Sequence, residues 1–161
     1  MIKVLFVCHG NICRSPMAEF VMKDLVRKQG LADCFAIASA GVSDEEHGNP
    51  VHRGTRQKLA EVGIPVENRT ARQMTRADYA EYDYLIGMES WNLRGMRSIA
   101  GGDPEHKIHR LLDYAGRPRD IADPWYTGNF DVTYDDIQEG CQAFLEYLTA
   151  NEADRIFRLH F

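Results

Sequence analysis

The sequence predicts an α/β protein built on a parallel sheet, because patterns typical of strands and of helices alternate along it. Short apolar runs alternate along the chain with longer segments in which apolar residues recur at helical spacing. Strands that alternate with helices form right-handed parallel crossovers. No repeat, linker or low-complexity segment interrupts this order, so we expect residues 1–161 to form a single domain. The apolar runs that we assign to strands are residues 2–7, 35–39, 84–88 and 108–112.

The helices follow from apolar spacing and from the residues that stop it. Residues 16–29 have apolar side chains at helical spacing, and Gly30 follows as a stop signal. Residues 133–149 form a long amphipathic pattern that turns Cys141 inward, and Cys34 also occupies a core position. Shorter helices are expected at residues 53–62, 75–82 and 90–99, with loops at 41–52 and 113–131.

A short loop joins the first strand to the first helix and has the composition of an anion site. It includes Gly10 and Asn11, and it ends at Ser15, which fits a helix N-cap, before Pro16, which fits the first helical position. Backbone N–H groups of a tight loop and the positive end of a helix both favour an anion. We therefore expect phosphate, sulfate or vanadate-like anions to bind here.

Cys8 and Arg14 bracket this loop in the pattern Cys-x5-Arg. A thiolate is the reactive form of cysteine, and an arginine, a helix N-terminus and inward amides all favour it. An arginine fork binds two oxygens of a phosphate-like group and stays charged. A buried cysteine beside a solvent-facing arginine would fit the spacing alone. The surrounding strand, Gly-Asn, Arg-Ser-Pro and helix favour a nucleophile placed beside its electrophile.

The residues from Val7 to Pro16 resemble the signature of the low-molecular-weight protein tyrosine phosphatases. The resemblance extends, in family order, to about residue 148 through Ser39-Ala40-Gly41, Gly48-Asn49-Pro50, Ala71-Arg72-Gln73, Asn92-Leu93-Arg94 and Asp123-Pro124-Trp125-Tyr126. It implies a three-layer α/β/α fold with four parallel strands in the order 2-1-3-4. It also implies an enzyme that needs no metal or cofactor and hydrolyses phosphotyrosine in proteins through a phosphocysteine at Cys8.

By the same resemblance, Asp123 is the general acid and later the base that activates water. An Asx-turn before Pro124 is the alternative interpretation, and Asp120 is a weaker candidate for the same role. Trp125 and Tyr126 would form the wall of a slot for the phenyl ring, although both could instead pack back onto the domain.

Other loop residues are expected to bind phosphate or support the loop: His9, Gly10, Asn11, Ile12, Cys13, Ser15 and Ser39. In the family, a serine and a histidine hold the loop asparagine in an unusual backbone conformation. Arg69 stands where that histidine is usual, which leaves the third member of the network open. His9 is either a bystander at the mouth or a group that favours the Cys8 thiolate.

Cys13, the second thiol of the loop, has two interpretations. Free cysteines usually serve as small packing residues. In the resembling family, loop cysteines so placed can form a reversible disulfide with the nucleophile, which would protect Cys8 from over-oxidation.

The amino-acid composition limits the kinds of binding partner and the cellular compartment that we expect. The formal charge of −5 does not support a nucleic-acid footprint, and no apolar run is long enough to span a membrane. Met1 leads directly into the first strand without a signal pattern, and the four cysteines lack a zinc or secreted-disulfide spacing. We therefore expect a cytoplasmic protein.

Three other functions remain open at this stage. Arsenate reductases share the loop and fold but need further cysteines, typically near residues 75–90, where this chain has none. Arginine phosphatases carry threonine where Ile12 stands, and Ile12 favours a phenyl ring. A non-catalytic phosphate-binding module would lack the nucleophile or the acid, but Cys8 and Asp123 are both present.

Overall fold

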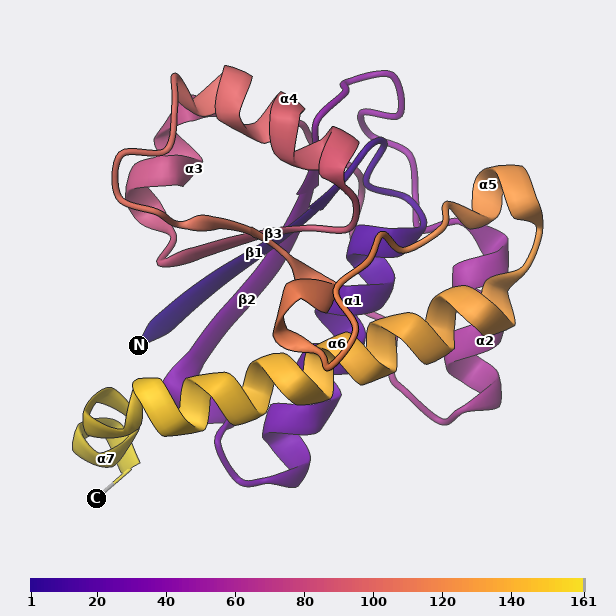
Figure 1. Ribbon diagram of the computed structural model, residues 1–161. Helices are drawn as coiled ribbons and strands as arrows, with labels where there is room; N and C mark the ends of the chain where they lie inside the picture. Colours follow the sequence, from indigo (N-terminus) through magenta and orange to yellow (C-terminus); the bar gives the residue numbers. More distant parts are fainter. Residues whose placement is uncertain (161) are drawn as a thin grey trace.

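The computed structural model describes residues 1–160, with only the backbone of His160; residue 161, the end of the expected domain, lies outside the described part. Four strands form one sheet, in which every pair of neighbours is parallel. Their order, β2-β1-β3-β4, confirms the predicted one (Figure 1). The strands are β1 (Ile2–Cys8), β2 (Phe35–Gly41), β3 (Tyr84–Gly87) and β4 (Ile108–Arg110).

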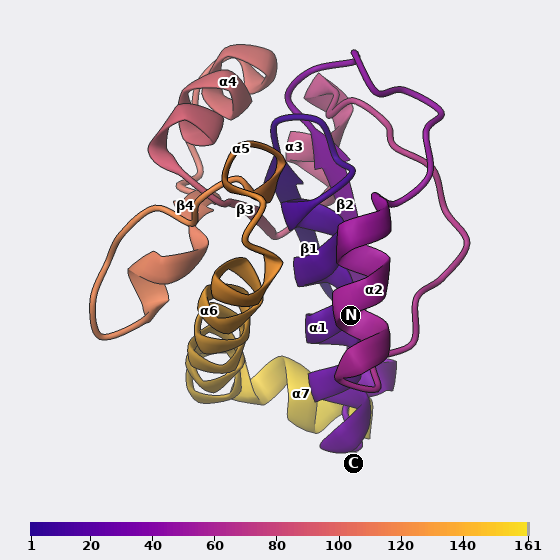
Figure 2. The same ribbon diagram turned by 90° about the vertical axis from the view of Figure 1, so that its right-hand side faces the viewer.

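Helices cover both faces of this sheet, as the three-layer prediction requires (Figures 1 and 2). One face packs on α1 (Arg14–Lys28), α2 (Arg53–Glu61) and α6 (Phe130–Asn151). The other face packs on α3 (Arg76–Glu81) and α4 (Ser90–Ala100). The remaining helical segments are η1 (Ala32–Cys34), η2 (Leu111–Tyr114), α5 (Pro124–Thr127) and α7 (Ala153–His160).

The central strand β1 is buried on both faces, which explains its nearly continuous apolar sequence. Val4 and Phe6 point into the core under α1 and α6, whereas Leu5 and Val7 point into the core under α4. Register pairing places Cys8 opposite Gly41 of β2. The carboxyl ends of adjacent parallel strands therefore meet beside the loop that follows Cys8, where ligands of open α/β sheets bind.

Two predicted boundaries near the sheet edge are wrong. The fourth strand ends at Arg110 rather than at residue 112, because Leu111 and Leu112 both enter the same core, which alternating strand positions cannot do. The next two residues complete the short helix η2. The expected loop at 113–131 also contains α5 and the start of α6, whose first turn Asn129 caps by accepting a hydrogen bond from Val132 N at 3.1 Å.

The start of α1 also differs from the prediction. The helix begins at Arg14, with Cys13 at the N-cap position, so Ser15 lies inside the first turn instead of capping it. Its hydroxyl is thereby free to contact the preceding loop. Other ends shift by one or a few residues, as is usual for sequence-based boundaries. Within residues 1–160, no helix has both the length and the apolar character needed to cross a membrane.

Candidate active site

Cys8 ends β1, and its thiol faces hydrogen-bond donors from the following loop. Its side chain is buried, with the backbone N of Asn11 3.3 Å and the hydroxyl of Ser15 3.1 Å from Sγ. Both groups can donate to a sulfur anion, and hydrogen bonds to a charged form favour that form. The position of Ser15 inside α1 thus gives it a role beside the thiol that a capping serine would not have.

Asn11 holds the loop in a conformation that few residues adopt. Its backbone φ is +61°, and the residue is fully buried. Asparagine tolerates positive φ better than most residues. The side-chain amide donates to Ser15 Oγ at 2.8 Å and to Ser39 Oγ at 3.0 Å. Ser39 thus supports the loop from β2 and does not line the pocket.

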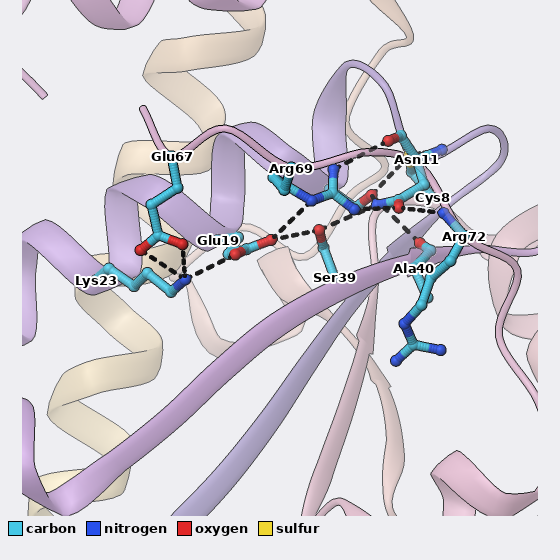
Figure 3. Close-up of polar contacts among 10 residues, drawn as sticks. Cys8, Asn11, Glu19, Lys23, Ser39, Ala40, Glu67, Arg69 and Arg72 are labelled. Carbon is cyan, nitrogen blue, oxygen red and sulfur yellow. Dashed lines mark hydrogen bonds and ion pairs between the residues drawn. The ribbon is translucent and has the colours of Figure 1, made fainter. Parts of the chain in front are cut away.

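Arg69 occupies the place in this network that the sequence comparison left open (Figure 3). It donates from Nη1 to the backbone O of Asn11 at 3.3 Å, and from Nη2 to the Asn11 side-chain oxygen. Its Nε lies 3.8 Å from the carboxylate of Glu19, which is buried on α1. Arg69 is therefore the third member of the network around Asn11, which the sequence analysis left open.

Gly41 lies behind the same loop at the end of β2. A Cβ atom at this position would come within 2.8 Å of the His9 backbone oxygen and 3.2 Å of the Asn11 side chain. The next two backbone N–H groups donate to the loop, from Val42 to Cys8 O and from Ser43 to His9 O, each at 2.9 Å. Glycine is thus required at this position because the two segments approach so closely.

Arg14 is almost completely buried and connects the loop to two other segments. Its Nη1 donates to the backbone O of Ile121 at 2.8 Å, and its Nη2 lies 3.1 Å from Glu89 and 3.4 Å from Asp123. Burial alone would lower the pKa of Arg14, but Cys8, Glu89 and Asp123 outweigh burial and raise it. The guanidinium is therefore a fixed positive charge beside the thiol.

Asp123 lies at the N-cap of α5 in the extended conformation expected before proline. One carboxylate oxygen accepts from Trp125 N at 3.0 Å, and the other faces Arg14. Asp120 has a different environment, because it accepts from Ser90 N and from Arg110, each at 2.9 Å. Burial would raise the pKa of Asp120, but these bonds lower it. Asp123, and not Asp120, faces the site.

A pocket of about 120 Å³ opens above Cys8. Trp125 and Tyr126 form part of its wall with exposures of 57% and 82%, so neither packs back into the domain. Trp125 is instead steadied edge-on by His52, with ring centroids 5.7 Å apart. The pocket is lined by Cys8, His9, Gly10, Ile12, Cys13, Arg14, Glu45, Glu46, Asp123, Trp125 and Tyr126.

Comparison with known proteins agrees with this geometry. The sequence model of the family described as low molecular weight phosphotyrosine protein phosphatase matches residues 3–154. The chain belongs to this family. It is 44% identical to the low molecular weight protein-tyrosine-phosphatase YfkJ of Bacillus subtilis over 147 residues, which covers 90% of this chain and 94% of that protein.

Solved structures show the same fold across nearly the whole chain. The crystal structure of YfkJ superposes with a TM-score of 0.91 at 42% identity, covering 94% of this chain and 97% of that one. A low molecular weight protein tyrosine phosphatase from Streptococcus pyogenes gives 0.85 at 40% identity, covering 95% and 97%. A Drosophila arginine phosphatase also gives 0.85, at 33% identity, covering 93% and 99%.

Several site residues of this phosphatase family member were missed by sequence reasoning. Glu89 forms an ion pair with Arg14 and lies just beyond the end of β3. The available signal was this position, because ligands of parallel sheets bind beyond the carboxyl ends of the strands. The sequence around Glu19 is typical of a solvent-exposed helix position. The available signal was its i,i+4 spacing from Lys23, which favours an ion pair between the two side chains. Glu45 and Glu46 line the mouth from the 41–52 loop, and Glu45 lies 3.8 Å from His9. His9 therefore faces the mouth.

Cys13 shares the pocket lining with Cys8 but differs in its chemistry. Burial, followed by the neighbouring Cys8 and Asp123, raises the pKa of Cys13 to about 12, so its thiol stays protonated at neutral pH. All four cysteines are free, and Cys34 and Cys141 are fully buried, as their predicted core positions require. Because the thiolate is the reactive form of cysteine, the protonated Cys13 thiol is a poor nucleophile.

Proposed function

We propose that this protein hydrolyses phosphotyrosine in proteins through a phosphocysteine on Cys8. The observation that carries the proposal is the convergence of Cys8, Arg14 and Asp123 on one pocket with an aromatic wall. The thiol supplies a nucleophile, the buried arginine a site for the phosphate oxygens, and the carboxyl group a proton for the leaving group. Trp125 and Tyr126 provide flat faces for a phenyl ring.

In the first step, the phosphate enters the loop of residues 8–14 and binds Arg14. The Cys8 thiolate attacks phosphorus in line, so that an S–P bond forms as the bond from phosphorus to the phenolic oxygen breaks. Asp123, as the carboxylic acid, donates its proton to that oxygen, and tyrosine leaves. Preorganised donors, including the Arg14 guanidinium, balance the charge on the equatorial oxygens.

In the second step, water replaces the thiolate. Asp123 is now a carboxylate and accepts a proton from the water as the water oxygen attacks phosphorus. The S–P bond breaks, inorganic phosphate leaves, and the Cys8 thiolate is restored. The hydroxyl of Ser15, 3.1 Å from Sγ, can donate to the sulfur as its negative charge returns. The cycle consumes one water and needs no metal or cofactor.

Substrate comparison tests this proposal against the nearest alternative. The likeness to a Drosophila arginine phosphatase makes phosphoarginine a second candidate, but Ile12 and the aromatic pair line the pocket with apolar surface suited to a phenyl ring. Matched phosphotyrosine and phosphoarginine peptides should be assayed with a chelator and a thiol reductant. We expect kcat/KM to favour phosphotyrosine. The reverse preference would contradict the proposal, and so would arsenate reduction or phosphate binding without turnover.

We also propose a cytoplasmic location. All four cysteines are free, and the proposed nucleophile must stay reduced to react. Fractionation of the native cells, with immunodetection of the untagged protein, would test the location directly. Recovery outside the cytoplasmic fraction would contradict it.

Replacing Asp123 with asparagine should separate proton transfer from structure. Asparagine keeps the side-chain oxygen that caps α5 but has no acidic proton to donate. For a poor leaving group such as phenyl phosphate, we expect kcat to fall roughly 10²- to 10⁴-fold. Phosphorylation of Cys8 by an activated nitrophenyl ester, measured in single turnovers, should change much less. Equal losses with both substrates would show that Asp123 is not the acid.

A further inference from the structure

We propose that Arg69, paired with the buried Glu19, is a positioning residue that holds the 8–14 loop in its reactive geometry. This inference rests on the proposed phosphatase function and adds a residue that does not touch substrate. Arg69 lies on the segment between α2 and α3, behind the loop and outside the lining of the pocket. Figure 3 shows it between Asn11 on one side and Glu19 on the other.

Asn11 controls the hydrogen-bond donors that face the Cys8 thiol. Its backbone N donates to Cys8 Sγ at 3.3 Å, and its side-chain amide reaches the hydroxyl of Ser15, which contacts the same sulfur. Its positive φ is uncommon for a residue other than glycine and persists only where surrounding contacts enforce it. A change at Asn11 would therefore move two hydrogen-bond donors of the nucleophile.

Arg69 holds Asn11 through two hydrogen bonds. The guanidinium binds the backbone oxygen and the side-chain oxygen of Asn11 together, so it fixes both ends of the residue. The same side-chain oxygen also accepts from Arg72 N at 3.1 Å. A planar fork can make such paired contacts, whereas a lysine ammonium acts as a single point charge. Arg69 thus fixes the orientation of Asn11 in addition to supplying a positive charge.

Arg69 is itself anchored by the buried carboxylate of Glu19. Glu19 is 4% exposed, accepts from Ser39 Oγ at 2.5 Å and Lys23 Nζ at 2.8 Å, and lies beside the Arg69 guanidinium. Lys23 continues outward to Glu67 at 2.9 Å. Removing a cationic partner of a buried carboxylate strongly destabilises the folded protein, because it leaves a buried charge uncompensated. Arg69 and Glu19 should therefore act as a unit, and their substitutions should not be additive.

The charge of Arg69 does not change over the working pH range. Burial lowers the pKa of Arg69, while Glu19 and Cys8 oppose this effect and Arg72 adds to it. An arginine nevertheless stays charged over the range in which enzymes work. The charged groups around it are Glu19, Glu67, Lys23, Arg72 and the Cys8 thiolate. The hydrogen bonds from Arg69 to Asn11 should therefore be independent of pH, whereas a histidine at this position would gain or lose its charge between about pH 5 and 8.

The test begins with Arg69→Ala and a matched control, Arg155→Gln. Arg155 also joins distant segments, through Asp83 and Glu152, but lies far from the pocket along the chain. For p-nitrophenyl phosphate, we expect Arg69→Ala to lower kcat roughly 10- to 100-fold, as small misplacements of reacting groups do. Binding of inorganic phosphate should weaken as well. Arg155→Gln should shift only the unfolding temperature.

Chemical rescue separates positioning from general stability. A cavity of about 200 Å³ lies beside Arg69, lined also by Arg56 and Val66, and gives small solutes a path to the vacated place. Guanidinium at millimolar, non-denaturing concentrations should restore part of the activity of Arg69→Ala and should leave the activity of Arg155→Gln unchanged. Wild-type kcat in folded Arg69→Ala, or a loss that guanidinium does not restore, would overturn the proposal.

Three further variants, two single and one double, test the proposal if Arg69→Ala does not fold. Arg69→His should approach wild-type activity at acid pH and lose it as the imidazole deprotonates, adding a limb that the wild-type pH profile lacks. Glu19→Gln should lower kcat, and the double variant Arg69→His/Glu19→Gln should lose less than the two single losses combined. Additive losses and an unchanged pH profile would each contradict the pairing. Wild-type turnover of aryl phosphate tests the phosphatase function separately.

Discussion

Cys8→Ser protein is expected to lose aryl phosphate hydrolysis by roughly 10⁴-fold or more, as removal of an enzymatic nucleophile does. A serine hydroxyl at this position needs a base, but the groups within hydrogen-bonding distance of Sγ are the hydroxyl of Ser15 and an amide of Asn11. Neither group can deprotonate an alcohol. The substitution is nearly isosteric, so the loop should keep its shape and its affinity for inorganic phosphate.

The measurement combines steady-state rates with a chemical trap. Denaturant quench of wild type during turnover should yield a protein heavier by one phosphoryl group, located at Cys8 by peptide mass spectrometry. The serine variant should show neither the added mass nor turnover, and calorimetry should show that it still binds phosphate. Cys13→Ser is the matched control, and its phosphoenzyme should form normally, because the protonated Cys13 thiol is a poor nucleophile. Substantial turnover by Cys8→Ser would refute the covalent mechanism.

The second large effect should come from Arg14→Lys, although the charge is conserved. The wild-type guanidinium contacts Ile121 O, Glu89 and Asp123 while facing the pocket, and an ammonium cannot keep this arrangement and also bind two phosphate oxygens. We expect kcat to fall roughly 10³-fold, within the range known for arginines that stabilise phosphoryl transfer. Phosphate affinity should fall too.

Arg119→Lys provides the control for this substitution. Arg119 pairs with Asp136 and Glu139 on the outer side of α6, away from the pocket lining. Surface ion pairs of this kind contribute little to stability, so activity and unfolding temperature should hardly change. Comparison of the two variants isolates the bidentate geometry from the general effect of an arginine-to-lysine change. If Arg14→Lys retained most of the wild-type kcat, Arg14 would act only as a point charge.

The site divides into parts that the sequence could predict and parts that it could not. The nucleophile and the arginine lie in one continuous loop, where residue spacing determines what can meet. Glu89 reaches Arg14 from just beyond β3, and Asp123 reaches it from the N-cap of α5. A strand pattern does not show which side chain beyond a strand turns inward. Asp123 was found because the family resemblance extends to its loop.

The wrong start of α1 has a physical reason. Ser-Pro is typical of an N-cap followed by the first helical residue, but here the backbone O of Cys13 already accepts from Met17 N at 3.2 Å. The Ser15 hydroxyl is used by Cys8 and Asn11 instead of by the helix end. Local propensity was outweighed by the contacts of the loop. The sequence shows that Arg69 departs from the family pattern, but its contacts with Asn11 and Glu19 depend on the fold, which brings the three residues together.

Helix α1 also determines which changes of length the protein can tolerate. Arg14, Ser15 and Glu19 stand on its first turns, so their relative directions are set by the helical repeat. One residue inserted between Ser15 and Glu19 would rotate Glu19 by about 100° away from Ser39. One residue inserted in the 41–52 loop would leave these three directions unchanged while reshaping the mouth. Evolution can therefore alter what enters this pocket by changing loop length, while the helix conserves the chemistry beneath it.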